Sequence, residues 1–179
     1  MIFLFLLASA FSFGQYRSDY GRLSPDRTNE IKVNALSLLI YGTEIGYERI
    51  VSDGVGAGIS VMVPYKNTAS DKILTTSLNY YISPYVRYYF EPMASGFFFE
   101  GFGIYANRKH DTSDASYTPT TPNYSTFGLG FGGGRKWVQY SGFTFEASAG
   151  IGRNIIVPDH ATLAQNFSFK LGVSAGYRF

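Results

Sequence analysis

The chain has 179 residues, of which 18% are aromatic and only 16% are charged, and its formal net charge is +2. This composition excludes an intrinsically disordered protein, which is rich in charge and poor in aromatic residues, and so small a net charge argues against nucleic acid as a partner. The absence of cysteine excludes a disulfide scaffold, a thiolate metal site and a cysteine nucleophile, while the abundance of Gly, Tyr and Phe favours β-structure over a helical bundle.

Residues 1–14 have the pattern of a secretory signal peptide. They carry no charge, and the apolar run over 2–7 is far shorter than the roughly 20 residues of a transmembrane helix. Small residues follow this run, and cleavage fits them either after Ala10 or after Gly14. We expect cleavage after Gly14, because the polar sequence begins there. Residues 15–28 then form a short N-terminal segment before a single β-domain over 29–179.

From residue 29 onward the sequence alternates between apolar and small or polar residues with a period of two, which predicts β-strands. The clearest case is 166–179, where seven apolar residues alternate with seven small or polar ones without an exception. Eight segments of this kind predict strands over 29–40, 43–51, 55–65, 78–90, 97–107, 124–137, 143–153 and 166–179.

The connections between these segments fall into two classes of length. The short ones are 52–54, 91–96 and 138–142, and the long ones, rich in Thr, Ser, Asn, Asp and Pro, are 66–77, 108–123 and 154–165. An antiparallel up-and-down barrel has this pattern when one end carries tight turns and the other carries long loops. The tight connection at 40–43 is the exception to the alternation.

The apolar face of the strands is expected to point outward, into lipid. The opposite face is mostly Gly, Ser, Thr and Asn, with too few charges for a water-exposed surface. The strands are also long enough, since a tilted strand needs about 9–11 residues to cross the hydrocarbon core. Aromatic residues gather near the strand ends, as two girdles at the membrane interfaces would require. The girdle near the short turns would contain Tyr89, Phe90, Phe97, Trp137, Tyr140 and Phe143.

The last strand ends in Tyr177 and Phe179, a terminal aromatic that closes an alternating segment. In this feature, in size and in loop pattern, the chain resembles the small eight-stranded outer-membrane barrels of the OmpA and OmpX type. The stretches 31–34 and 42–49 are similar to the opening hairpin of small barrels common in Bacteroidetes. The resemblance implies insertion into a Gram-negative outer membrane by the barrel assembly machinery, with Tyr177 and Phe179 as the assembly signal. It also implies that 15–28 lies in the periplasm and that the long segments face outside, among outer-membrane lipid and lipopolysaccharide.

Charged residues on the polar face would lie inside the barrel. By this parity the interior contains Lys32, Glu44, Glu48, Arg87, Glu100, Glu146 and Lys170. Because an eight-stranded barrel is just wide enough to be filled by side chains, and an unpaired charge there is costly, we expect these residues to form a structural polar plug. Glu100 shares its parity with the apolar Phe98 and Phe102, which suggests a β-bulge at Gly101 or Gly103.

The sequence gives little support for catalysis. Glu44 and Glu48 are about 13 Å apart along one strand, too far for acid–base cooperation. His110 and His160 lie in the long segments, and neither has a serine two residues away. The glycines over 128–133 have dinucleotide-motif spacing, but they alternate with apolar residues as in a strand, whereas the motif needs a turn into a helix. We therefore expect no enzyme, no cofactor and no bound metal.

The sequence thus predicts a monomeric outer-membrane β-barrel with a structural or surface-interaction role through its long outer segments. Three alternatives stay open at this point. One is an outer-leaflet lipid-modifying enzyme that uses His110 or His160. Another is a narrow, porin-like pore past the charged interior. The third is a soluble periplasmic ligand-binding barrel with its apolar face inside.

Overall fold

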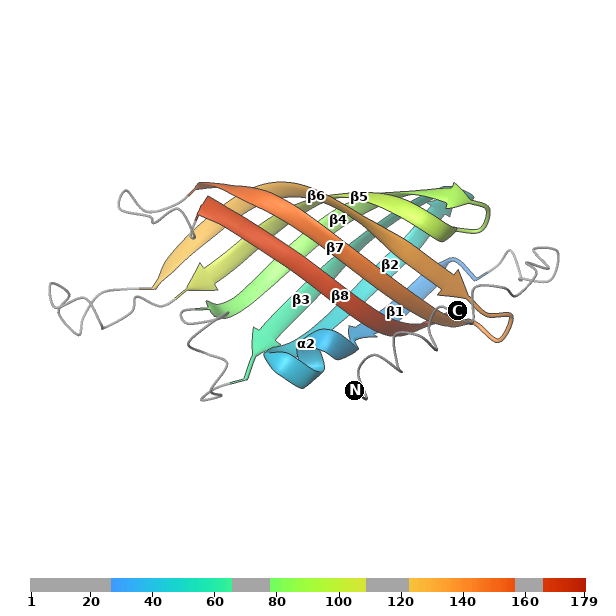
Figure 1. Cartoon of the computed structure of the whole chain (residues 1–179), viewed down its shortest axis with the longest axis horizontal. Helices are drawn as coiled ribbons and strands as arrows, with labels where there is room; N and C mark the ends of the chain where they lie inside the picture. The colour runs from blue at the N-terminus through green and yellow to red at the C-terminus, as the bar shows by residue number, and fades with distance from the viewer. Residues whose placement is uncertain (1–26, 66–77, 109–122, 157–165) are drawn as a thin grey trace, which may run out of the picture.

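The structure is a computed structural model that describes residues 27–65, 78–108, 123–156 and 166–179. Its elements in chain order are β1 (Asn29–Asn34), α2 (Ala35–Ile40), β2 (Gly42–Ser52), β3 (Val55–Pro64), β4 (Leu78–Glu91), β5 (Ser95–Arg108), β6 (Tyr124–Val138), β7 (Phe143–Ile156) and β8 (Phe167–Arg178). Each strand pairs antiparallel with its neighbour in sequence, and β8 pairs with β1, so the eight strands close into a barrel (Figure 1). The predicted all-β up-and-down architecture is confirmed.

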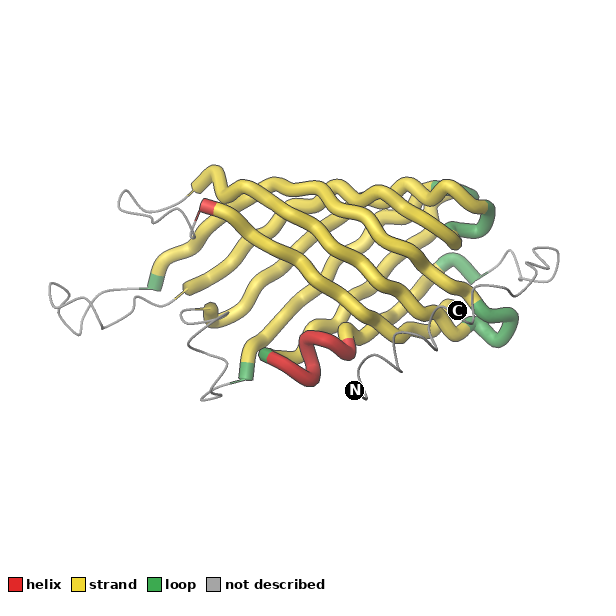
Figure 2. Tube along the Cα trace, in the orientation of Figure 1, coloured by secondary structure: helices red, strands yellow, loops and turns green. Residues whose placement is uncertain are grey.

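The two ends of the barrel differ in how they connect the strands. One end, here called the turn end, carries the short turns at 53–54, 92–94 and 139–142. The other, here called the helix end, carries α2, and there β3, β5 and β7 end and β4, β6 and β8 begin (Figure 2). Two glycines at the turn end adopt a positive φ, which glycine tolerates best: Gly142 in the β6–β7 turn (+97°) and Gly96 at the start of β5 (+73°). Among the described residues, no helix is long and apolar enough to cross a membrane.

Side chains alternate between the two faces of the barrel wall. Along β5 the rings of Phe97 and Phe99 are exposed on the outside, whereas Phe98 and Phe102 are buried inside. The strands β7 and β8 have the same alternation, with apolar residues outward and small or polar residues inward. The interior is therefore mainly polar and aromatic, which is the reverse of a soluble ligand-binding barrel with its apolar face inside.

Glycines on the inner faces of β6 and β7 make room for the aromatic rings of β5. A Cβ atom at Gly130 would lie only 2.5 Å from Cζ of Phe102, and one at Gly134 only 2.8 Å from Cζ of Phe98. Gly150 faces the same Phe102 ring. The glycines over 128–133 thus belong to a strand that faces large side chains. They do not form the turn into a helix that a dinucleotide motif needs.

The suggested bulge in β5 is absent, and that prediction was wrong. Pairing between β4 and β5 keeps one register from Ile82↔Tyr105 to Arg87↔Glu100. Phe98, Glu100 and Phe102 therefore all point inward from a regular strand. The apolar parity mates of Glu100 reflect an interior that accepts aromatic rings, and they do not mark a change of face.

The predicted strand over 29–40 is also wrong in its second half, which forms the helix α2. The side chain of Asn34 caps this helix by accepting hydrogen bonds from the backbone N–H groups of Leu36 (3.1 Å) and Ser37 (3.3 Å). This segment forms a helix for two reasons. Its apolar and polar residues alternate over only a few positions, and the Asn34 cap satisfies the first backbone donors of a helix. Pairing of β1 with β8 consequently stops at Asn34↔Ser174.

Candidate functional site

The interior of the barrel holds a cluster of charged side chains contributed by seven of the eight strands. The structure places inside it all the residues that parity assigned there: Lys32 on β1, Glu44 and Glu48 on β2, Arg87 on β4, Glu100 on β5, Glu146 on β7 and Lys170 on β8. All except Glu44 meet in one ion-pair network.

Glu48 is the centre of this network. Its carboxylate accepts hydrogen bonds from Nζ of Lys32 (3.0 Å), Nζ of Lys136 (3.0 Å) and Nη1 of Arg87 (3.1 Å). The hydroxyls of Tyr85 and Tyr89 donate to the same carboxylate. Glu48 is fully buried, so the three cations supply the stabilisation that water would give an exposed carboxylate.

Arg87 connects Glu48 to two further carboxylates. Its guanidinium binds Glu146 through two nitrogens, at 2.6 Å and 2.9 Å, and its Nε donates to Glu100 at 2.7 Å. Two-point binding of this kind fixes geometry as well as charge. Glu100 also accepts a hydrogen bond from Nζ of Lys170 at 3.0 Å.

Sequence reasoning missed three members of the network, Lys136, Glu30 and Arg178. Lys136 contacts the carboxylates of Glu30 (3.2 Å) and Glu48 (3.0 Å), and Nη2 of Arg178 binds Glu30 at 3.1 Å. Arg178 also donates to the carbonyl oxygens of Met93 (2.6 Å) and Ala94 (3.1 Å), which fastens the β4–β5 turn across the turn end of the barrel. The parity rule contains the signal for all three, since each shares a face with residues that were assigned inward.

The prediction that Tyr89 belongs to the outer aromatic girdle was wrong. Its side chain is only 2% exposed and lies inside the barrel, where its hydroxyl donates to Glu48 and accepts from Nζ of Lys136 at 2.7 Å. Aromatic rings also stack with the network, and the Arg87 guanidinium lies 4.5 Å from the ring centroid of Tyr85 and 4.3 Å from that of Phe98. A tyrosine ring suits an interior that is partly ionic and partly aromatic.

The remaining members of the expected girdle point away from the interior or lie at the turn end. Phe90, Phe97 and Phe143 are more than half exposed on the outer face, Tyr140 is exposed in the β6–β7 turn, and Trp137 is partly exposed. Tyr177 packs edge-on against Phe143, with ring centroids 5.4 Å apart. The backbone of Phe179 exchanges two hydrogen bonds with that of Asn29, which joins the end of the chain to β1.

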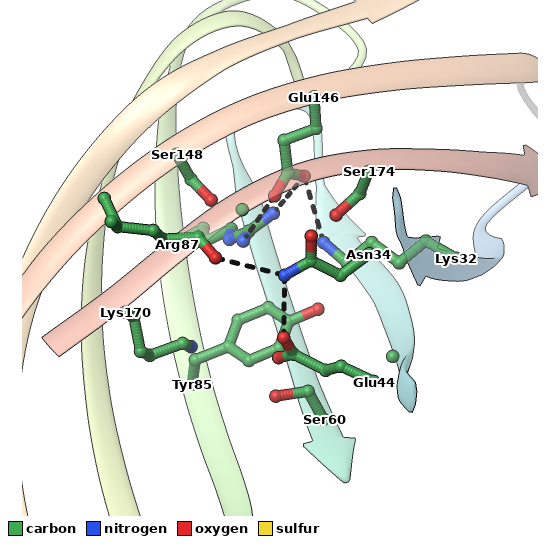
Figure 3. Close-up of a pocket in the computed structure, with 13 residues that line it drawn as sticks. Lys32, Asn34, Glu44, Ser60, Tyr85, Arg87, Glu146, Ser148, Lys170 and Ser174 are labelled. Atoms are coloured by element: carbon green, nitrogen blue, oxygen red, sulfur yellow. Dashed lines mark hydrogen bonds and ion pairs between the residues drawn. The ribbon is translucent and has the colours of Figure 1, made fainter. Parts of the chain in front are cut away.

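Glu44 lies toward the helix end, apart from the ion pairs. Its carboxylate accepts a hydrogen bond from the side-chain amide of Asn34 at 2.8 Å, and it forms no ion pair with a described residue. Between Glu44 and the network is a cavity of about 40 Å³, large enough for a few water molecules. Figure 3 shows Glu44 and Ser60 on one side of this cavity and Arg87 with Glu146 on the other.

The carboxylates of Glu30, Glu48 and Glu146 offer oxygen atoms within 4.8 Å of one another, the spacing of a metal site. The ammonium of Lys136 lies within 4.0 Å of all three, so a cation of the protein occupies that place. The network with Glu44 has five carboxylates (Glu30, Glu44, Glu48, Glu100, Glu146) and five cations (Lys32, Arg87, Lys136, Lys170, Arg178). These charges cancel, which accounts for the arrangement without a metal ion.

His110 and His160, the residues of the lipid-modifying alternative, lie outside the described residues, as does the expected signal peptide over 1–14. The structure therefore adds no geometry for either expectation.

Comparison with known proteins supports the same architecture. Residues 1–165 match the model of a family described as a protein of unknown function, DUF3575. The chain belongs to the DUF3575 family. The N-terminal β-barrel domain of Pseudomonas aeruginosa OprF, a solved crystal structure, is similar to this member of the family with a TM-score of 0.59 and 14% sequence identity. The match covers 86% of this chain and 98% of the OprF domain, and it confirms the resemblance in fold to small eight-stranded barrels. No curated protein matches the chain.

Proposed function

We propose that this DUF3575 protein is an outer-membrane β-barrel with a structural and surface-interaction role. The observation that carries the proposal is the distribution of side chains across the wall. Large apolar residues such as Phe131, Phe169 and Leu171 are more than half exposed on the outer face, while charged residues pair inside. In water such a surface would drive aggregation, whereas in a bilayer it is the face that lipid requires. The fold shared with the OprF barrel domain supports the same location.

The interior supports a structural role in preference to transport. Ion pairs extend from Lys170 through Glu100, Arg87 and Glu48 to Lys136, and onward to the turn end. Each side chain in this chain of contacts is held by a partner of opposite charge, so a passing ion would have to separate buried pairs at considerable cost. The barrel is thus proposed as a sealed, charge-neutral scaffold that acts without catalysis and as a monomer.

The proposed role in surface interactions is supported by the position of the long connections between strands. The connections 66–77, 109–122 and 157–165 all join strands at the helix end of the barrel. Their Thr-, Ser-, Asn- and Pro-rich sequences suit segments presented outside the cell, next to lipopolysaccharide. In this orientation the turn end faces the periplasm, and Tyr177 and Phe179 at the end of the chain serve as the signal for the barrel assembly machinery.

Electrophoretic heat-modifiability on the outer-membrane fraction tests the proposal. The protein is expected in that fraction. Because folded membrane barrels resist SDS until they are boiled, the unheated protein is expected to migrate differently from the boiled protein. Planar-bilayer recordings with the same material are expected to show no conductance steps above background. Recovery of the protein from the soluble fraction without a mobility shift contradicts the location, and regular conductance steps contradict the sealed interior.

A further inference from the structure

The outer wall of the barrel contains an apolar groove that neither the fold nor the interior network explains. It has a volume of about 380 Å³ and crosses β6, β7 and β8. Its floor is formed by the small residues Gly133, Ala147 and Ala149, and its side by Leu171 and Val173. Leu36 of α2 also lines it, so the helix that follows β1 contributes to the groove.

Strand register explains why the surface is hollow here. One row across the outer wall reads Gly133↔Ala149↔Leu171, and the adjacent row toward the helix end reads Phe131↔Ile151↔Phe169. Outward side chains are small at adjoining positions of β6 and β7 and large around them. Large lipid-facing side chains are therefore missing over this area.

A cation lies beside the groove, on its turn-end side. Arg135 is the register partner of Ala147 in the groove floor and points outward from β6. Its guanidinium lies 5.0 Å from the ring centroid of Phe97 and 5.4 Å from that of Trp137, which positions it through cation–π contacts. Within the described residues Nε of Arg135 and Nε1 of Trp137 are buried donors without a hydrogen-bond acceptor. One of these donors belongs to the guanidinium itself, and an outward cation with no carboxylate partner among the described residues suits an anionic oxygen ligand.

We propose that the groove and Arg135 together bind one anionic glycerophospholipid. An acyl chain lies in the groove over Gly133, Ala147 and Ala149, and the phosphate diester binds the guanidinium of Arg135. Arg135 is nearer the turns, and the apolar groove extends from it toward the middle of the barrel. This order of charged and apolar parts fits a lipid in the leaflet at the turn end. This inference rests on the proposed membrane location.

A second outward arginine supplies the control within the same molecule. Arg49 also lies near the turn end and also pairs in register with an outward alanine, Ala57. The next row on that wall is Tyr47↔Ile59, where the groove row has Gly133↔Ala149. Arg49 therefore has the same charge and a similar depth, but it has large side chains beside it where Arg135 has small ones.

The test uses the full chain, folded in detergent and examined by native mass spectrometry with added phosphatidylglycerol or phosphatidylcholine. The wild type is expected to retain one phosphatidylglycerol with about tenfold preference over phosphatidylcholine, because both lipids offer a phosphate diester but only phosphatidylcholine carries a choline cation, which the Arg135 guanidinium repels. R135Q should remove the preference. A147F should fill the groove and reduce retention of both lipids about tenfold. The matched variants R49Q and A57F should behave as the wild type.

Two results would overturn the inference. One is a phosphatidylglycerol preference that survives in R135Q, and the other is equal lipid retention in A147F and A57F. Every variant is first checked for heat-modifiability in the membrane fraction. If the wild type lacks the shift, the proposed membrane location fails together with the lipid site. If all variants shift but bind lipid alike, the lipid site alone fails.

Discussion

Glu44 and Glu48 are the same residue type on the same inner face of β2, about 13 Å apart by the usual rise per residue, yet their surroundings differ completely. Glu48 contacts three cations and two tyrosine hydroxyls, whereas Glu44 accepts from the neutral amide of Asn34 and forms no ion pair with a described residue. The interior of this barrel therefore has two regions with different chemistry. The turn-end region is held by opposite charges, and the helix-end region by neutral hydrogen bonds around a small cavity.

This difference predicts where substitutions should destabilise the barrel most. A buried carboxylate with several cations around it cannot be neutralised without leaving those cations uncompensated. A carboxylate at the edge of a cavity with room for water can lose its charge at much smaller cost. Unfolding free energies should consequently fall steeply for substitutions in the turn-end region and weakly for equivalent substitutions in the helix-end region.

The largest effect is expected for E48Q. This change preserves side-chain volume and removes the charge that Lys32, Arg87 and Lys136 share, so the free energy of unfolding should decrease by about 3–5 kcal/mol. Urea titration of the protein folded in lipid vesicles measures this decrease. The temperature at which the SDS mobility shift occurs should fall in parallel.

E44Q is the matched control for that prediction. Because the variant keeps the hydrogen bond from Asn34 and disturbs no ion pair among the described residues, the expected decrease is below about 1 kcal/mol. Equal losses for E44Q and E48Q would remove the distinction between the two regions of the interior.

An intermediate effect is expected for N34A at the junction of β1 and α2. Asn34 caps the helix, donates to Glu44 and to the carbonyl of Leu171, and accepts from the backbone N–H of Val173 at 3.2 Å. Loss of the cap alone costs about 1 kcal/mol, and the other contacts should raise the total to about 2 kcal/mol. Urea titration measures the total, and hydrogen exchange at the Val173 amide reports the opening of the β1–β8 seam.

N79A is the comparison for this variant, since Asn79 also lies at the helix end but, among the described residues, makes a single side-chain hydrogen bond, to Asn107. Its expected cost is about 1 kcal/mol or less, without faster exchange at Val173. If N34A leaves exchange at Val173 as slow as in the wild type, the seam is held by other contacts.

Alternation in the sequence was sufficient to predict the eight strands, the tight turns and the barrel, because a period of two and the turn residues are local properties. It failed for Ala35–Ile40, where a brief alternation concealed a capped helix. Tyr89 was assigned to the outer girdle because of its aromatic ring, although its spacing of two from the inward Arg87 places it on the inner face. The partners of each ion pair inside the barrel could not be predicted from the sequence. Contacts such as Lys32 with Glu146 join residues 114 positions apart, and they depend on strand stagger, which a single sequence does not encode in readable form.

The smallest effect is expected from two serines that face each other across β3 and β4 in the helix-end region. Ser83 donates a hydrogen bond to the carbonyl of Gly103 at 2.8 Å and accepts one from Nζ of Lys170 at 3.4 Å. The buried hydroxyl of its register partner Ser60 has no acceptor or donor among the described residues. S83A should therefore lower the free energy of unfolding by about 1 kcal/mol, and S60A should leave it within about 0.5 kcal/mol of the wild type. Urea titration of both variants side by side measures the difference. A cost for S60A as large as that for S83A would mean that water in the cavity satisfies Ser60, and that the helix-end region is held through solvent as firmly as through direct contacts.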